Sequence, residues 1–340
     1  MRGMREAREV YDGGRHAFRF GIYPGALLGD ETGIVHPVRP DDPAALAAAL
    51  DELQGAEPEF LVRIYRSFAR TVTPPGQTPE HWADLLDRPG RKLDLVLQFR
   101  EPTGDPAGWA AYVRGQIREL GPRLGSVQIC EEPNADLPVL DGSIPGVRAA
   151  LIEGVLAAKA EIRALGLTAD VGFNAVPTLD PAADFWPALG ELAPPEFRTA
   201  LDYVGLDFFP DVFRPVPPGQ LATAVAWALH RFRHTDLPAA GLPATLPVRI
   251  CENGWPTGPG RPEPEQARAL TTVIREVAYQ AVELNIDGYS LFALRDADSS
   301  GPGPFHHFGL LHDDHTPKPA FAAYRDLIAE LGPALRARRE

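Results

Sequence analysis

Eight short runs rich in Val, Ile, Leu and Phe recur along this chain, separated by longer stretches of helical pattern. Parallel strands need crossover connections, and the helices that make these connections cover the sheet. The alternation therefore predicts an α/β fold with a parallel sheet. The predicted strands are Phe18–Tyr23, Phe60–Tyr65, Leu93–Phe99, Ser126–Glu131, Ala169–Asn174, Asp202–Phe208, Val248–Glu252 and Asp287–Phe292.

Amphipathic patterns between these runs predict helices at residues 42–53, 145–166 and 264–285. The last two repeat apolar residues at intervals of three and four, which is helical periodicity. An open doubly wound sheet is the alternative, but no glycine-rich nucleotide-binding fingerprint follows an early strand. We therefore predict a single (β/α)₈ TIM barrel over residues 1–340, with a short irregular lead-in at about residues 1–16.

Charge and hydropathy limit the classes of partner. The net charge is −13 and the sequence contains no run of Lys or Arg, which argues against binding to nucleic acid or to an anionic membrane surface. No apolar segment approaches transmembrane length, and the N-terminal residues lack the apolar core of a signal peptide. These features predict a cytoplasmic protein, and they leave the oligomeric state open.

Carboxylates follow two of the predicted strands. Glu132 comes after the fourth strand, within Glu131-Glu132-Pro133-Asn134, and Glu252 ends the seventh, before Asn253-Gly254-Trp255. The carboxyl ends of barrel strands line the catalytic mouth, and strands four and seven lie across the barrel from each other. Two facing carboxyls are what cleavage of a glycosidic bond requires, about 5–5.5 Å apart for retention and roughly 6.5–9.5 Å apart for inversion.

The two motifs resemble those of clan A of the glycoside hydrolases, which places an acid/base Glu in Asn-Glu-Pro after strand four and a nucleophilic Glu at the end of strand seven. Residues 202–211 resemble strand six of family 1, and residues 288–298 and 308–328 resemble the clan's strand eight and final helix. The chain is also similar to families 5, 39 and 113. This resemblance implies retaining hydrolysis of a β-glycosidic bond in a small-molecule or oligosaccharide substrate, with Glu252 as nucleophile and Glu132 as acid/base.

Further residues are candidates for contact with substrate. Arg63 resembles an arginine near the end of the clan's strand two and would favour an ionised Glu252, or it simply bridges strands. Trp255 is either a platform for a sugar ring or a packed loop residue, and Asn174 either binds a hydroxyl or ends its strand. The complete set of predicted substrate-binding residues is Arg63, Glu131, Asn174, Asp207, Phe209, Trp255 and Phe292.

Three positions depart from the clan's pattern. Glu131 replaces the Asn before the acid/base, and Asp207-Phe208-Phe209 replaces Asn followed by two tyrosines, one of which donates a hydrogen bond to the nucleophile. Phe292 replaces a tryptophan. Acidic residues at positions 131 and 207 suggest a sugar that carries an amine, or one that lacks the usual interaction at its 2-hydroxyl. The same departures support an alternative function, a catalytically degenerate barrel that only binds carbohydrate.

Cofactors are not predicted. His306 and His307 are adjacent, and no third ligand lies at metal spacing, so no metal site is expected. A Schiff-base enzyme needs a lysine at the catalytic rim, whereas Lys92 begins its strand at the opposite end. Two glutamates suffice for the predicted reaction.

Overall fold

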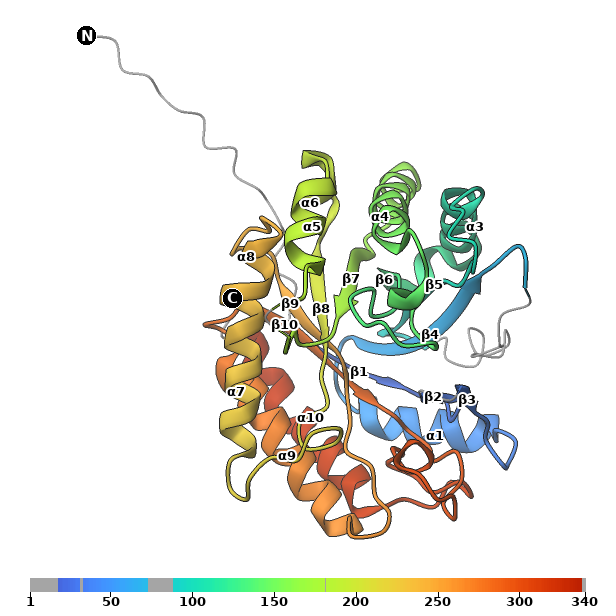
Figure 1. Cartoon of the computed structure of the whole chain (residues 1–340). Helices are drawn as coiled ribbons and strands as arrows, with labels where there is room; N and C mark the ends of the chain where they lie inside the picture. Colours follow the sequence, from blue (N-terminus) through green and yellow to red (C-terminus); the bar gives the residue numbers. More distant parts are fainter. Residues whose placement is uncertain (1–17, 31–32, 73–87, 181, 338–340) are drawn as a thin grey trace.

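The computed structural model describes residues 18–30, 33–72, 88–180 and 182–337. Eight parallel strands form a closed barrel in the order β1-β10-β9-β8-β7-β6-β5-β4, which confirms the predicted fold class (Figure 1). The strands are β1 (Arg19–Tyr23), β4 (Phe60–Phe68), β5 (Arg91–Phe99), β6 (Leu124–Ile129), β7 (Asp170–Ala175), β8 (Tyr203–Asp207), β9 (Val248–Asn253) and β10 (Ile286–Phe292).

Helices follow the strands and lie around the outside of the barrel (Figure 1). They are α1 (Pro43–Gln54), α3 (Trp109–Leu120), α4 (Val147–Ala164), α5 (Phe185–Leu192), α6 (Pro195–Ala200), α7 (Leu221–Arg231), α8 (Leu237–Ala239), α9 (Glu263–Gln280) and α10 (Pro319–Ala337). A π-helical turn (Phe232–Asp236) joins α7 to α8, and single 3₁₀ turns occur at Gly121–Arg123, Asp141–Ser143 and Pro304–His306. An antiparallel hairpin, β2 (Leu28–Asp30) and β3 (Gly33–Val35), lies between β1 and α1.

The first helix shows how local sequence fixes these elements. The Asp42 carboxylate accepts hydrogen bonds from the backbone N–H groups of Ala44 and Ala45. Pro43 begins the helix, where its missing N–H costs little because the first N–H groups of a helix have no partner within it. Gly55 ends it with a positive φ of 50°, a conformation that glycine adopts at little cost. The predicted helices at 42–53, 145–166 and 264–285 correspond to α1, α4 and α9.

Strand β4 extends further than the sequence predicts. Arg66, Ser67 and Phe68 continue the parallel pairing with β5, so the strand ends at Phe68 rather than at Tyr65. Arg63 therefore lies in the middle of its strand and not near the end, which corrects the expected position. Its side chain points into the barrel below the rim, where it is almost fully buried.

Charged residues also fill the opposite end of the barrel. Arg249, near the start of β9, lies 3.0 Å from Asp170 and 2.6 Å from Asp287, and Arg19 pairs with Asp170 as well. These side chains come from the amino ends of their strands, where conserved charge in barrels serves stability rather than catalysis. The catalytic mouth is therefore expected at the other end.

Two expectations from the sequence concern the N-terminal residues and membrane-spanning helices. The proposed lead-in at residues 1–16 lies outside the described residues. Among the helices of the described ranges, none is long and apolar enough to cross a membrane.

Candidate active site

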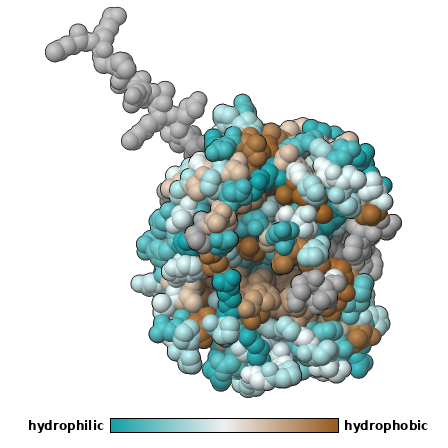
Figure 2. Space-filling view, in the orientation of Figure 1, coloured by the Kyte–Doolittle hydropathy of each residue, from teal (hydrophilic) through white to brown (hydrophobic). Residues whose placement is uncertain are grey.

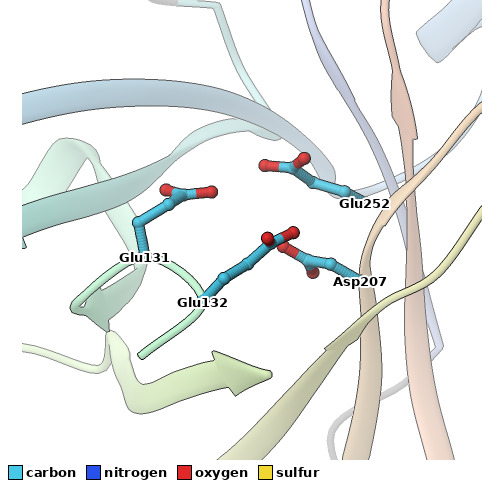
Figure 3. A group of neighbouring side chains, drawn as sticks. All are labelled: Glu131, Glu132, Asp207 and Glu252. Atoms are coloured by element: carbon cyan, nitrogen blue, oxygen red, sulfur yellow. The ribbon is translucent and has the colours of Figure 1, made fainter. Parts of the chain in front are cut away.

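Four carboxylates meet at the carboxyl ends of the strands: Glu131 and Glu132 after β6, Asp207 on β8 and Glu252 on β9. One oxygen from each lies within 4.8 Å of the others, and all four side chains are buried. Figure 3 shows the carboxyl of Glu131 turned toward that of Glu252, while the carboxyl of Glu132 lies beside that of Asp207. The structure thus brings together both predicted catalytic residues and two of the predicted substrate-binding residues.

A sharp turn after β6 lets two consecutive glutamates face the same site. Successive side chains of a strand point to opposite faces, so this arrangement requires the strand conformation to end. Cys130 and Glu132 both have positive φ values, 64° and 43°. Two side-chain acceptors hold the turn: Asp141 accepts the N–H of Glu131 at 2.7 Å, and Asn174 accepts the N–H of Glu132 at 2.8 Å.

Glu252 is held by two residues of β4. The Tyr65 hydroxyl donates a hydrogen bond to Oε1 of Glu252, and Nε of Arg63 lies 3.2 Å from the same oxygen. The rest of the Arg63 guanidinium donates to Asp94 at 2.7 Å and to Gln128 at 2.8 Å. Arg63 therefore contacts Glu252 as predicted and also bridges the strands, so the two interpretations of this residue are compatible.

Burial controls the protonation of the site. Desolvation, followed by the charge of Glu252, raises the pKa of three carboxyls well above the ordinary value: those of Glu131, Glu132 and Asp207. Burial likewise raises the pKa of Tyr65, so its hydroxyl keeps the proton that it donates. The site therefore favours the neutral forms of these three carboxyls, and Arg63 contacts the cluster through Glu252.

Two carboxylate oxygens in this cluster lack a donor. Oε2 of Glu131 and Oδ1 of Asp207 are buried and have no hydrogen-bond partner among the described residues. The nearby Arg100 pairs with Asp141, with Nε 3.2 Å from its carboxylate. Buried acceptors of this kind are normally satisfied, so they mark positions where a ligand's donors fit.

Asn174 connects the strands beneath the site. Its side-chain oxygen accepts from the backbone of Glu132, and its side-chain nitrogen donates to Asp207. Both ends of the amide are thus engaged by the protein. A direct hydrogen bond from Asn174 to a sugar stays a prediction, and its observed contacts are those of a positioning residue.

The predicted aromatic contacts divide into two kinds. Phe209 and Phe292 line the cavity above the carboxylates, with ring centroids 6.1 Å apart in an edge-to-face arrangement. Trp255 is buried instead among loop residues: the Arg261 guanidinium lies 4.5 Å from its ring centroid, and its N–H lies 3.3 Å from Asp211. This placement agrees with the packed-loop interpretation of Trp255, because its face is already covered.

Several residues of this candidate site were not predicted from the sequence. Tyr65 contacts Glu252, and Gln98 lines the cavity, while Asp94 and Gln128 orient Arg63. One signal was available, because Arg63 and Tyr65 are two residues apart on a strand and therefore share a face. Polar residues at that spacing within an otherwise apolar strand indicate a shared polar contact inside the barrel.

The four carboxylates could also bind a cation. Carboxylate oxygens suit hard cations such as Ca²⁺ and Mg²⁺, and the four oxygens are close enough to share one ion. The histidine pair is engaged differently, since Nε2 of His307 lies 2.7 Å from the carbonyl oxygen of Gly301. A cation at the site, whether an ion or a ligand's amine, would favour the ionised forms of these carboxyls.

Comparisons with known proteins bear on the fold. No family model matches the sequence, and no curated protein matches it. Among solved structures, a family 39 glycoside hydrolase from Bacteroides cellulosilyticus WH2 has a TM-score of 0.60 at 18% identity, over 94% of this chain and 64% of that one. The β-glucuronidase of Bifidobacterium dentium, complexed with coumarin-3-O-glucuronide, has a TM-score of 0.59 at 16% identity, over 93% and 46%.

A GH5_18 protein from Streptomyces cattleya, in complex with Manβ1-4GlcNAc, has a TM-score of 0.60 at 17% identity, over 92% of this chain and 80% of that one. The present chain spans less than two thirds of the first two neighbours. At these identities the likeness concerns the fold. The chain therefore shares its eight-stranded barrel with glycoside hydrolases of the kinds found in clan A, as the sequence motifs predicted.

Proposed function

We propose that this protein is a retaining glycoside hydrolase that cleaves a β-glycosidic bond by double displacement. The observation that carries the proposal is the approach of Glu132 and Glu252, whose nearest paired oxygens lie within 4.8 Å. This bound is nearer to the roughly 5–5.5 Å between the carboxyls of retaining enzymes than to the about 6.5–9.5 Å of inverting enzymes, which place a water between them.

In the first step, Glu252 attacks the anomeric carbon and forms a glycosyl ester. Tyr65 and Arg63 engage Oε1, so the second oxygen of Glu252 is the one that attacks. As the bond to the leaving oxygen breaks, Glu132 transfers its proton to that oxygen. The raised pKa of Glu132 supports this role, because a general acid must be protonated before the step.

In the second step, water attacks the anomeric carbon of the ester. Glu132, now ionised, accepts a proton from that water, and the bond between the sugar and Glu252 breaks. The products are a free sugar with retained configuration and the original protonation state of both glutamates. Tyr65 supports the cycle by donating a hydrogen bond to Glu252. The replacement of a tyrosine by Phe209 had left open whether the nucleophile has such a donor.

The alternative is a barrel that binds carbohydrate without cleaving it. The acidic residues at positions 131 and 207 and the phenylalanines at 209 and 292 favour it. The intact contacts from Tyr65 and Arg63 to Glu252 weigh against it, because a binding protein has no need to hold a nucleophile.

The test is turnover of a panel of 4-nitrophenyl β-glycosides (gluco, galacto, manno, xylo and glucosamine) and of soluble β-glycans. Wild type is compared with Glu252→Gln and with Glu330→Gln, an exposed residue of α10 as matched control. We expect turnover to fall by several orders of magnitude in Glu252→Gln alone. A 2-deoxy-2-fluoro glycoside of the preferred sugar should label a peptide that contains Glu252, detected by mass spectrometry.

The stereochemistry of the first product separates the mechanisms. Proton NMR during the first minutes of hydrolysis should show the β-anomer before mutarotation. The α-anomer would contradict retention. Binding of oligosaccharides by wild type with no turnover across the panel would support the degenerate barrel instead.

A further inference from the structure

The cavity above the four carboxylates has a volume of about 750 Å³. This size lies within the roughly 300–1,000 Å³ of sites that enclose drug-sized ligands. A single sugar ring in contact with the carboxylates leaves much of it unfilled. The walls of the cavity therefore indicate what the remainder of the ligand is.

The mouth of this cavity is apolar and exposed. Four large hydrophobic residues that line it are exposed to solvent: Leu137 by 45%, Leu179 by 43%, Phe213 by 56% and Trp227 by 53%. The face drawn in Figure 2 is hollowed near its centre, and hydrophobic side chains gather around the hollow. Exposed apolar side chains are unremarkable when scattered, but a group of them around one concave site marks a binding surface.

A continuous aromatic wall joins the mouth to the carboxylates. Phe292, near the floor, contacts Phe209 edge to face, and Phe209 contacts Phe213 with centroids 5.7 Å apart. Phe213 in turn stacks on Phe305 at 5.6 Å with an angle of 24° between the rings. A ligand whose reacting end lies among the carboxylates must extend along these rings to reach solvent.

This wall discriminates between ligands. An oligosaccharide can stack the C–H faces of its rings on aromatic side chains, but its equatorial hydroxyls also need hydrogen-bond partners. Hydroxyls that face the leucine, valine and phenylalanine side chains of this lining lose water without gaining a partner, which is unfavourable. A hydrocarbon or aromatic group gains from the same contacts in proportion to its buried area. The polar floor and apolar wall together match a molecule with one polar end and one apolar end.

We propose that the cavity binds a soluble glycoside with a large apolar aglycone, the sugar among the carboxylates and the aglycone along Phe209, Phe213 and Trp227. This inference rests on the proposed function for the orientation of the ligand. Binding of the glycoside does not depend on its turnover, so the apolar site and the proposed enzymatic function can be rejected independently.

The experiment is calorimetric titration of Glu252→Gln with methyl, butyl, hexyl and octyl β-glucopyranosides below their micellar concentrations. The octyl compound is repeated with galactose, mannose and glucosamine as the sugar. We expect affinity to rise about fourfold for each added methylene, the order seen when a CH₂ group leaves water. Cello-oligosaccharides of similar length should bind more weakly than the octyl glycosides.

Two variants locate the aglycone. Phe213→Ala and Trp227→Ala should each weaken octyl glycoside binding by at least fivefold, and the loss should shrink as the chain is shortened. Tyr279→Ala, an aromatic residue of α9 that is 76% exposed and lies outside the cavity, is the matched control and should bind like the parent. Circular dichroism confirms that each variant is folded.

Affinity that does not change with chain length overturns the proposal, as does tighter binding of cello-oligosaccharides. Binding of the protein to phosphatidylcholine vesicles that depends on Phe213 would reassign the apolar mouth to a membrane surface. A chain-length dependence in a protein without hydrolytic activity would retain the apolar site and reject the proposed enzymatic function.

Discussion

The hydroxyl of Tyr65 on β4 donates a hydrogen bond to Oε1 of Glu252 on β9, joining residues that are 187 positions apart in the sequence. Burial raises the pKa of this tyrosine, so it acts as a neutral donor. The departure of Phe209 from the clan's pattern suggested that the nucleophile had lost its tyrosine. The structure supplies one from a different strand.

Replacement of Tyr65 by phenylalanine tests whether this contact serves catalysis. Hydrogen bonds to charged groups contribute about 1.5–3 kcal/mol, which corresponds to roughly a 10- to 150-fold loss in rate if the contact is made only to the reactive carboxylate. We expect Tyr65→Phe to lower kcat/KM within this range on the best 4-nitrophenyl glycoside, and to slow labelling of Glu252 by the fluoro glycoside by a similar factor.

Tyr112→Phe is the matched control, because that hydroxyl donates to the backbone of Ser67 on the outer side of β4. Its kcat/KM should stay close to that of wild type. Equal losses in both variants would show that a general change in β4, and not the contact with Glu252, causes the effect.

The sequence predicted two glutamates that the structure brings together, but not the residues that contact them. Glu132 and Glu252 end apolar runs, and strand order alone places them across the barrel. The partners of Arg63 depend on register instead: β4 and β5 pair so that Arg63 lies beside Asp94, and a single sequence does not specify this alignment. Trp255 shows the same limit in a loop, since its position three residues after Glu252 does not specify which way its side chain turns.

The role of Glu132 can be separated from that of Glu252. Glu132→Gln cannot protonate a leaving group, so hydrolysis of alkyl glycosides should fall by at least a hundredfold. Substrates with a 4-nitrophenolate leaving group need less protonation and should retain more activity in the first step. Azide, which attacks without a general base, should restore turnover and give a β-glycosyl azide, identified by NMR. An absence of rescue would argue that Glu132 is not the acid/base.

The dependence of activity on pH should also follow from Glu132. A general acid works while protonated, so activity is present below its pKa and is lost as the pH rises through it. Because burial and the charge of Glu252 raise the pKa of Glu132, the basic limb should lie well above the ordinary glutamate value of about 4.3. This limb should be absent in Glu132→Gln assayed with the activated substrate. An unchanged limb would assign it to another group.

Crowding of the carboxylates should make stability depend on pH. The pKa of Glu131 is raised in the folded protein, so between the unfolded value near 4.3 and the raised value the folded state binds more protons. Stability therefore falls as the pH rises through this window.

Glu131→Gln removes the contribution of this carboxyl to the pH dependence, and we expect its Tm to exceed that of wild type by about 2 °C or more at pH 8, with a smaller difference at pH 4.5. Glu153→Gln, exposed on α4, is the control and should show the same difference at both pH values.

The cluster of carboxyls also predicts which charge the preferred sugar carries. Oε2 of Glu131 and Oδ1 of Asp207 lack donors among the described residues, and an ammonium group supplies both donors and charge. We expect kcat/KM to be highest for a β-glucosaminide, lower for the glucoside and lowest for the glucuronide, with at least a tenfold range. Glu131→Gln and Asp207→Asn should narrow this range.

The assay is run with and without EDTA, because a divalent ion bound by the same oxygens would produce a different pattern. Loss of activity on chelation, restored by Ca²⁺ or Mg²⁺, would assign the cluster to a metal. Equal turnover of glucosides and glucosaminides would reject recognition of an amine.

Arg249 provides a test of the barrel's other end, where it bridges Asp170 and Asp287 at 3.0 and 2.6 Å. Removing one partner from a buried ionic network leaves its charges uncompensated, at a cost of about 3–5 kcal/mol. We expect Arg249→Leu to lower the free energy of unfolding in urea by this amount. Arg275→Leu, which breaks the exposed pair with Glu330, should leave the unfolding midpoint near that of wild type. Arg249 lies near the amino end of β9, and its ion pairs are with Asp170 and Asp287 and not with Glu252. The folded fraction of Arg249→Leu at low temperature should therefore keep the wild-type kcat. A large loss of kcat with unchanged stability would instead show that the ion pairs of Arg249 influence the reaction at the opposite end of the barrel.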